Sequence, residues 1–500
     1  MFNLKLLLPV IFAFTSFTLF SQEISIRLFR TQGEGVTWSP DGSRIMYDMK
    51  GKSPEHYYEI HVSDSNGSHD TCISCLCKDL PQKETGSPDW SSDGKYVTLV
   101  AEKSEHPGGH VPAIPGFGGF SDIWVMTADG RHAWKVLETN NDRNDGIIMP
   151  RFSRDGKKVV WVERKQYPHV FKKKDFFGFW VIKTADFVVV KGVPEFENIK
   201  TFEPKGSAFY ETYGFSPDGK RIIFCSNWDV PYWWLCRIYT IDAETGDDMK
   251  QLTQNDYNEH ACYSNDGKWI IWMSNTCATR QGTDWWIMRS DGTMKQRLTY
   301  FNEPDFPEYD GHKKWCGLGA FSPDDKKFVG GVQYSLLKQE GKIYMIDFLP
   351  CGNGSGLTGE YFSTDDFSGA KRMRTDAAIN YKWGPPWNDS LVTSNKFSVR
   401  WTGYVQSLYS ETYNFYVHDD KRMTVWLNDS LLLGPKSKSI AKDEKMAQIT
   451  LVKGLKYKLQ VEYRGNKKQK GTAILIWSSP HQYKQVIPAS QLYTKPDDAK

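Results

Sequence analysis

The middle of the chain contains the phrase Phe215-Ser216-Pro217-Asp218-Gly219, and the run Arg221-Ile222-Ile223-Phe224 follows one residue later. An Asp-Gly pair supplies the positive φ that a tight turn between two strands requires. Isoleucine and phenylalanine after such a turn favour a β-strand, and the aromatic residue before it is typical of the strand that leads into the turn. The phrase therefore predicts a β-hairpin.

Six copies of this phrase follow one another at intervals of roughly 50 to 60 residues, a period typical of propeller blades. The other five copies begin at Trp38, Trp90, Phe152, Tyr263 and Phe321. A second apolar phrase follows each copy and predicts a third strand, over residues 59–62, 122–126, 179–182, 237–241, 284–288 and 342–346. Several of these runs turn into a short outer strand. Four strands in each unit predict the blades of a six-bladed, all-β propeller.

The two ends of the repeat region complement each other. The last copy ends at Phe348 without an outer strand of its own. Ahead of the first copy, residues 24–29 alternate apolar with polar side chains, as a strand does. We expect this N-terminal strand to complete the sixth blade, because closing the ring removes sheet edges that would otherwise be exposed.

The repeat resembles the TolB-type, WD-like Pro-Asp repeat of bacterial periplasmic propellers. The phrase beginning at Phe215, with the later run Ile238-Tyr239-Thr240-Ile241-Asp242, carries this resemblance. It implies a TolB-like six-bladed β-propeller over residues 22–349. Propellers of this kind include protein-docking modules, peptidase accessory domains and a few polysaccharide lyases, so the resemblance implies a fold and leaves the function open.

A second domain is expected because 500 residues exceed what one core usually organises. A glycine-rich linker at residues 350–355 ends the repeat, and residues 457–463 alternate apolar with polar side chains as a half-buried strand does. The landmarks Gly359-Glu360-Tyr361-Phe362, Val399-Arg400-Trp401-Thr402 and Ile474-Leu475-Ile476-Trp477 resemble the lectin-like domain of anthrax protective antigen. This resemblance implies a carbohydrate-binding β-sandwich over residues 356–495.

The same resemblance implies a calcium site. In carbohydrate-binding members of that family, two adjacent aspartates hold a calcium ion that contacts sugar hydroxyls, and Asp419 and Asp420 correspond to them here. Calcium takes six to eight oxygen ligands, and Asn428 is a further candidate ligand. The alternative is that the aspartates only shape a turn, since Lys421 stands where the family usually has glycine.

The net charge and the N-terminal sequence indicate which partners and which cellular location to expect. The chain has 63 Lys and Arg against 60 Asp and Glu. Its net positive charge is therefore too small to attract nucleic acid or an anionic membrane surface. Residues 1–21 have one early lysine and then an apolar stretch, the pattern of a signal peptide. We therefore expect a secreted or periplasmic protein without a membrane span.

Nine cysteines in an exported chain permit disulfides, but because the number is odd at least one stays free or pairs between molecules. Cys72, Cys75 and Cys77 lie close together without a second Cys or His pair at zinc spacing, which favours a local disulfide or buried thiols over zinc. Cys225 and Cys236 flank a bend and are expected to form a disulfide across it.

No serine-hydrolase elbow, zinc-protease helix motif or phosphate-binding glycine loop occurs in the repeat region. Residues that enter successive inner strands are expected to meet at one mouth of the central channel. The catalytic candidates there are His260, Glu259 and His312, and the ligand-binding candidates are Asn258, Glu211 and Trp315. They can hold a divalent metal or perform acid–base chemistry on a uronic-acid sugar. The alternative is that they satisfy buried backbone groups at the channel lip.

The preferred interpretation is a non-catalytic exported binding protein. Its propeller docks a protein or a glycan, and its C-terminal domain binds carbohydrate such as a cell-surface glycan. One alternative is a propeller polysaccharide lyase, or another glycoside-acting enzyme, with a carbohydrate-targeting domain. Another is an envelope-assembly component resembling TolB.

Overall fold

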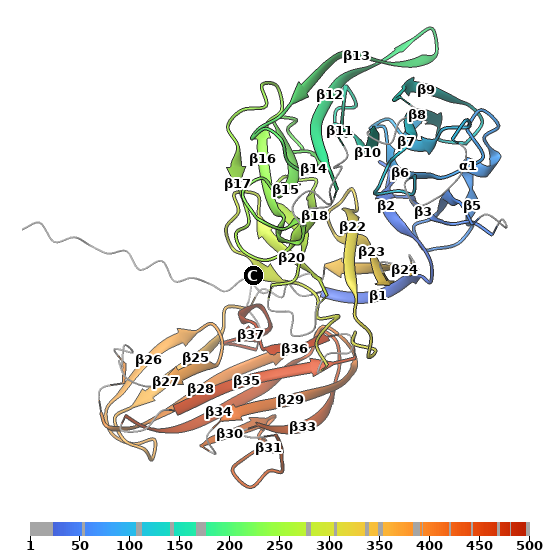
Figure 1. The fold of residues 1–500 in the computed structure, drawn as a ribbon. Helices are drawn as coiled ribbons and strands as arrows, with labels where there is room; N and C mark the ends of the chain where they lie inside the picture. Colours follow the sequence, from blue (N-terminus) through green and yellow to red (C-terminus); the bar gives the residue numbers. More distant parts are fainter. Residues whose placement is uncertain are drawn as a thin grey trace, which may run out of the picture. The chain divides into compact units, whose positions relative to one another are not determined.

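The computed structural model describes residues 24–496, except residues 53–55, 107–112, 141–144, 167–176, 277–281, 305–307, 336–339, 349–353, 384–390, 393, 420–421, 442–443, 468–470 and 481. The chain divides into one compact unit over Ile24–Leu349 and a second over Pro350–Lys500. The regular structure is almost entirely β-strand (Figure 1). Within the described ranges, no helix is both long enough and apolar enough to span a membrane.

In its described residues, the first unit consists of six antiparallel sheets of four strands each. The first sheet contains β2 (Glu34–Trp38), β3 (Arg44–Lys50), β4 (Tyr58–Asp64) and β5 (Thr71–Cys72). The second contains β6 (Thr85–Trp90), β7 (Tyr96–Glu102), β8 (Ser121–Thr127) and β9 (Ala133–Leu137). The third contains β10 (Gly146–Phe152), β11 (Lys158–Gln166), β12 (Phe179–Val190) and β13 (Val193–Phe202). A four-residue helix, α1 (Ile73–Leu76), follows β5.

The next three sheets repeat the same order. They contain β14 (Tyr210–Phe215), β15 (Arg221–Ser226), β16 (Arg237–Asp242) and β17 (Lys250–Gln251); β18 (Asn258–Tyr263), β19 (Trp269–Ser274), β20 (Asp284–Arg289) and β21 (Gln296–Arg297); and β22 (Trp315–Phe321), β23 (Lys327–Ser335), β24 (Glu340–Phe348) and β1 (Ile24–Arg30). The expected role of the N-terminal strand is confirmed, because β1 pairs antiparallel with β24 (Figure 1).

The repeated phrase forms the turn between the first two strands of each sheet. In the fourth sheet, Ser216 Oγ donates a hydrogen bond to Asp218 Oδ1 at 2.6 Å and accepts one from the backbone N–H of Arg221 at 2.9 Å. Gly219 lies at φ 71°, in the left-handed region that glycine adopts most readily. The hydrogen bond from Ser216, with one from the backbone N–H of Lys220, lowers the pKa of the Asp218 carboxyl. The same serine, aspartate and backbone contacts recur in all six sheets.

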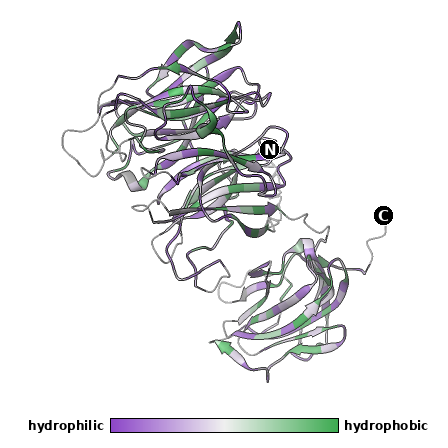
Figure 2. Ribbon diagram, turned by 90° about the vertical axis from the view of Figure 1, so that its right-hand side faces the viewer, coloured by the Kyte–Doolittle hydropathy of each residue, from purple (hydrophilic) through white to green (hydrophobic). Residues whose placement is uncertain are grey.

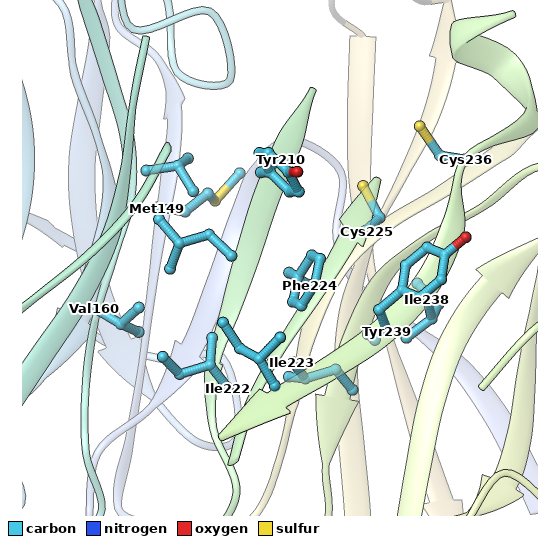
Figure 3. Packing of buried hydrophobic residues seen from close by; sticks show 14 of the residues in the cluster. Met149, Val160, Tyr210, Ile222, Ile223, Phe224, Cys225, Cys236, Ile238 and Tyr239 are labelled. Atoms are coloured by element: carbon cyan, nitrogen blue, oxygen red, sulfur yellow. The ribbon is translucent and has the colours of Figure 1, made fainter. Parts of the chain in front are cut away.

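Large apolar clusters fill the first unit. One of them joins the third, fourth and fifth sheets and includes Trp272. Val160, Phe224 and Ile238 belong to the same cluster (Figure 3). The first strand of each sheet is called its innermost strand below. These strands contact one another in chain order, from β2 to β6, β10, β14, β18 and β22, and β22 contacts β2. Their first-strand residues therefore surround one common interior.

The C-terminal unit contains two antiparallel sheets. One runs in the order β26 (Lys371–Asp376), β25 (Leu357–Phe362), β28 (Lys396–Gln406), β34 (Lys456–Asn466), β30 (Met423–Leu427) and β31 (Ser430–Leu433), with β37 (Leu492–Tyr493) on β28. The other runs in the order β27 (Asn380–Trp383), β35 (Gly471–Ser479), β29 (Glu411–Asp419), β33 (Glu444–Leu451) and β32 (Ser439–Ala441), with β36 (Gln482–Val486) on β35.

Both sheets of the C-terminal unit contribute to one core. Hydrophobic and hydrophilic residues alternate along its strands (Figure 2), and the inward set includes the fully buried Trp401 and Trp477. A buried polar network lies in this core. Asp376 Oδ2 accepts hydrogen bonds from the indole N–H of Trp401 at 2.7 Å and the hydroxyl of Tyr361 at 2.6 Å, and Arg374 forms an ion pair with the other carboxylate oxygen.

Candidate functional site

All six innermost strands of the first unit carry a register shift against their neighbours. A β-bulge of this kind turns a side chain away from the direction that regular alternation would give it. Three non-glycine residues at these bulges adopt left-handed backbone angles, Ser87 at φ 54°, Met149 at φ 58° and His260 at φ 53°. His260 is the one of the three that carries a strong metal-ligating or proton-transferring group.

The bulge in β18 brings three functional side chains together. Potential ligand atoms of Glu211, Glu259 and His260 all lie within 4.8 Å of one another. Glu211 comes from β14, and the other two come from the neighbouring β18. The sequence predicted this convergence of carboxylates and imidazole at the start of successive inner strands.

Each of the two carboxyl groups has one nearby tyrosine. The hydroxyl of Tyr213 donates to Glu211 Oε2 at 3.1 Å, and that of Tyr257 donates to Glu259 Oε2 at 2.7 Å. The ring of His260 lies edge-on to the Tyr213 ring, with centroids 5.9 Å apart. Its Nδ1 atom is buried and has no hydrogen-bond partner. The cluster therefore holds its carboxylates in place but leaves an imidazole nitrogen unsatisfied.

Burial controls the protonation of this cluster. It raises the pKa of Glu211 and of Glu259, and the Glu211 charge raises that of Glu259 further. Burial also lowers the pKa of His260 to about 4. Two carboxyls this close and this well buried do not both ionise readily, so a cation or a proton is required between them.

Two cysteines that the sequence did not connect with the site lie beside it. Potential ligand atoms of Cys225, Cys236 and Glu259 lie within 4.8 Å of one another. Cys225 pairs across the sheet with Glu211, and Cys236 immediately precedes β16 (Figure 3). Burial raises the pKa of the Cys236 thiol to about 11.

The expected disulfide between Cys225 and Cys236 is not formed, because both residues are free thiols. Their sulfur atoms are close, but each thiol also faces a buried carboxyl group. The other cysteine prediction is confirmed, since Cys72 and Cys75 form a local disulfide.

The remaining predicted propeller residues are not among the grouped ligands. Asn258 is buried, with its side-chain N–H groups on the carbonyls of Asn255 and Asp256 and its Oδ1 on the indole N–H of Trp272. His312 has a side chain that is 74% exposed and pairs with Asp310. Trp315 begins β22 opposite Gln333. Within the described part of the chain, the metal-ligand geometry thus groups Glu211, Glu259 and His260 without His312.

A cavity of about 390 Å³ lies where the same inner strands end. Its lining includes the aromatic residue that opens each of the six phrases, Trp38, Trp90, Phe152, Phe215, Tyr263 and Phe321. Asp89 and Arg151 also line it. From the sequence, we expected the site where the inner strands begin. The cavity at their other end was not predicted, although the six-fold recurrence of the aromatic residue indicated it.

Residues that depart from the repeat form part of the rim of this cavity. Arg154 and Asn265 stand where three of the other copies have proline. Arg154 Nη1 donates to the carbonyl and the side-chain oxygen of Asn265 at 2.7 and 2.9 Å, although 111 residues separate the two. Asn265 in turn donates to Asp325 Oδ1 at 2.8 Å. Three of the six turns are therefore joined across the opening.

The predicted calcium residues of the C-terminal unit occupy two places. Asp419 ends β29, and Asp420 and the Asp419 side chain lie outside the described residues. Asn428 and Asp429 form the two-residue turn between β30 and β31, at φ 49° and 62°. Asn428 Oδ1 accepts the backbone N–H of Lys458 at 2.9 Å.

The structure does not bring Asn428 together with Asp419. Strand β30 separates the turn from the residues that follow β29, and its five residues span roughly 13 Å at about 3.3 Å per step. Ligands of one calcium ion lie within about 2.3–2.6 Å of it. In the described residues Asn428 therefore serves as a turn residue.

The C-terminal unit is similar to a known domain. Residues 353–491 match the PA14 domain. Over 142 residues the chain is 43% identical to the anti-sigma-I factor RsgI3 of Acetivibrio thermocellus, covering 28% of this chain and 22% of the relative. Over 144 residues it is 25% identical to the protective antigen of Bacillus anthracis, covering 28% and 18%. The chain thus spans about a fifth of the length of these relatives.

Several solved structures are similar to parts of the chain. A putative TolB from Agrobacterium tumefaciens is 17% identical with a TM-score of 0.33, covering 66% of this chain and 99% of that one. An oligogalacturonate lyase in complex with manganese is 14% identical with a TM-score of 0.40, covering 63% and 78%. An anti-sigma factor domain-containing protein is 39% identical with a TM-score of 0.26, covering 30% and 50%.

Proposed function

We propose that this protein is an exported binding protein that attaches to carbohydrate through its C-terminal unit. The match of residues 353–491 to the PA14 domain is the observation that carries this proposal. The arrangement of two antiparallel sheets around one aromatic core supports a β-sandwich of the lectin-like kind. The signal-peptide pattern of residues 1–21 supports export.

Calcium is the proposed cofactor of this unit. Asp419 and Asp420 offer carboxylate oxygens, which are the ligands that calcium prefers. The backbone of Asp419 is well anchored, because β29 lies between β33 and β35 and Asp419 pairs with Ala473. When bound, calcium would supply a positive centre for two sugar hydroxyls.

A glycan array tests this proposal. The purified chain is applied with calcium and with a calcium chelator, beside the variant carrying Asp419→Asn and Asp420→Asn. Asp429→Asn is the matched control, because Asp429 is an exposed aspartate in the turn at the other end of β30. We expect binding to a subset of glycans that is lost in chelator and in the double variant but kept in the control. Binding that survives both treatments would remove calcium, and the absence of any bound glycan would remove the carbohydrate function.

For the first unit, we propose a six-bladed propeller that docks a protein or a glycan on its channel face. The contacts that run from β2 through the other inner strands and back support a closed ring. The aromatic cavity of about 390 Å³ is the proposed docking position, since all six sheets contribute to it. Arg154→Ala, at an exposed position of the cavity rim, should weaken docking while leaving the calcium-dependent glycan binding of the C-terminal unit intact.

The second candidate function is a polysaccharide lyase, favoured by the buried carboxyl and imidazole groups of Glu211, Glu259 and His260. Incubation with uronic-acid polysaccharides tests it through the ultraviolet absorbance of an unsaturated product. No product, or product formation that persists in His260→Ala, would exclude lyase action at this cluster.

A further inference from the structure

We propose that Glu211, Glu259 and His260 form a binding site for one divalent transition-metal ion of the zinc class. Their potential ligand atoms lie within 4.8 Å of one another and come from two neighbouring strands. Nitrogen and oxygen ligands of a single zinc ion lie at about 2.0–2.2 Å from it, so two of them are separated by no more than about 4.4 Å. The three side chains are thus almost in position before any ion is bound.

Two structural features of His260 indicate that a ligand is missing. Its Nδ1 atom is buried without a hydrogen-bond partner, although buried polar atoms in proteins are nearly always satisfied. Its backbone is also held in the left-handed region at φ 53°, which a residue with a side chain rarely adopts. A metal ion bound at the ring nitrogen would offset both unfavourable features.

The comparison with the other inner strands shows that the bulge alone does not explain the imidazole. Gly35, Ser87 and Met149 occupy left-handed positions at the corresponding bulges of β2, β6 and β10. None of these three provides an imidazole or a carboxylate. The repeat therefore needs a bulge at this point, but β18 alone among these four strands fills it with a strong metal ligand, beside Glu259.

The ligand types select the class of ion. Calcium and magnesium take oxygen ligands almost exclusively, whereas this site offers an imidazole nitrogen beside two carboxylates. The free thiols of Cys225 and Cys236 also lie next to Glu259, and such a mixture of nitrogen, oxygen and sulfur donors is typical of zinc. A divalent ion would balance the two carboxylate charges.

A second group of potential ligands lacks these properties. Glu59, His61 and Cys72 also lie within 4.8 Å of one another. However, Cys72 is joined to Cys75 by a disulfide, so it has no thiolate to offer. This contrast makes the cluster on β14 and β18 the site to test.

Zinc titration of the full chain tests the inference. The protein is dialysed against a chelator, then titrated with Zn²⁺ by calorimetry, and the bound metal is counted after desalting. We expect one zinc per chain at this site, with binding weakened by more than about 100-fold in Glu259→Gln and in His260→Ala. His312→Ala is the control, because His312 is an exposed histidine outside the cluster, and it should bind zinc as the unaltered chain does.

Folding of each variant is checked by circular dichroism in chelator. If His260→Ala fails to fold, Glu211→Gln and Glu259→Gln decide the outcome, since each keeps the shape of the carboxyl group. The inference is overturned if the unaltered chain binds no zinc, or if the two glutamine variants bind zinc as tightly as the unaltered chain. The titration does not involve a glycan, so its result is independent of the carbohydrate-binding proposal.

Discussion

Each unit of the chain buries a polar cluster around carboxyl groups. The two clusters differ in whether every polar atom has a partner. In the C-terminal unit, Asp376 receives the indole N–H of Trp401, the hydroxyl of Tyr361 and the guanidinium of Arg374. In the first unit, Glu211 and Glu259 face each other and the Nδ1 atom of His260 has no partner. A buried network that is complete stabilises a fold, whereas one that lacks a cation or donor is suited to binding one.

The largest expected effect concerns the core around the complete network. Trp401→Ala should destabilise the C-terminal unit by roughly 3–5 kcal/mol, because it leaves a large cavity and removes a hydrogen-bond donor from Asp376. Urea unfolding followed by circular dichroism measures this loss. Leu431→Ala, at a 64% exposed position of the same unit, should change stability by less than about 0.5 kcal/mol. Equal losses in the two variants would show that Trp401 is not a core residue.

Removing the charge of the complete network should also be costly. Asp376→Asn keeps the size of the side chain but takes the carboxylate away from Arg374 and offers an N–H group where Tyr361 and Trp401 both donate. We expect a loss of about 2–3 kcal/mol, because buried donors lose their acceptor, whereas the ion pair with the partly exposed Arg374 contributes little. A stability unchanged from that of the natural chain would mean that this network does not stabilise the unit.

Buried carboxyls in the first unit predict a dependence of stability on pH. Burial raises the pKa of Glu34 and Glu84 from 4.5 to about 7, so the folded chain binds more protons than the unfolded chain between these values. Their contribution to stability is therefore fully present below pH 4.5 and is lost as the pH rises through 7. His260 acts in the opposite sense, because its lowered pKa of about 4 makes stability rise with pH between about 4 and 6.5.

The variant Glu34→Gln isolates one of these groups. It should remove about 2–3 kcal/mol of the loss of stability between pH 5 and pH 8, since the amide cannot ionise. Denaturant unfolding at several pH values measures the slope. A slope identical to that of the natural chain would show that Glu34 titrates normally in the folded state.

The smallest effect is expected at the incomplete cluster. Glu259→Gln should change the stability of the metal-free chain by less than about 1 kcal/mol at neutral pH, because burial already favours the protonated, uncharged carboxyl there. The same substitution of carboxyl by amide at Asp376 is expected to cost several times more. Similar losses at the two positions, measured by urea unfolding in chelator, would remove the distinction between the clusters.

The strands were predictable because their signals are local. Each Asp-Gly turn is fixed by bonds between Ser216, Asp218 and Arg221 or their counterparts, so the phrase alone located the hairpins. The pairing of residues 24–30 with β24 followed from the missing outer strand of the last repeat. The carboxylates and imidazole on β14 and β18 were named from sequence for the same reason, since they enter strands whose positions the turns define.

The neighbours of the cluster could not be predicted because they depend on register and on contacts between sheets. A shift between Thr212 and Gly214 changes which residue faces which, so counting back from the turn misplaces the pairing of Glu211 with Cys225 by one residue. His312 lies in the loop ahead of β22, and no local pattern shows that its side chain points to solvent. In the C-terminal unit, the sequence distance between Asp420 and Asn428 did not reveal that a whole strand separates them.

The change in thermal unfolding midpoint on adding Zn²⁺ tests the difference between the two clusters most directly. The natural chain and Asp376→Asn should both show a higher midpoint for the first unit with zinc than with chelator, because a ligand that binds only the folded state stabilises it. Glu259→Gln should show no such rise. A rise of equal size in Glu259→Gln, or no rise in the natural chain, would contradict the assignment of the incomplete cluster as a metal site.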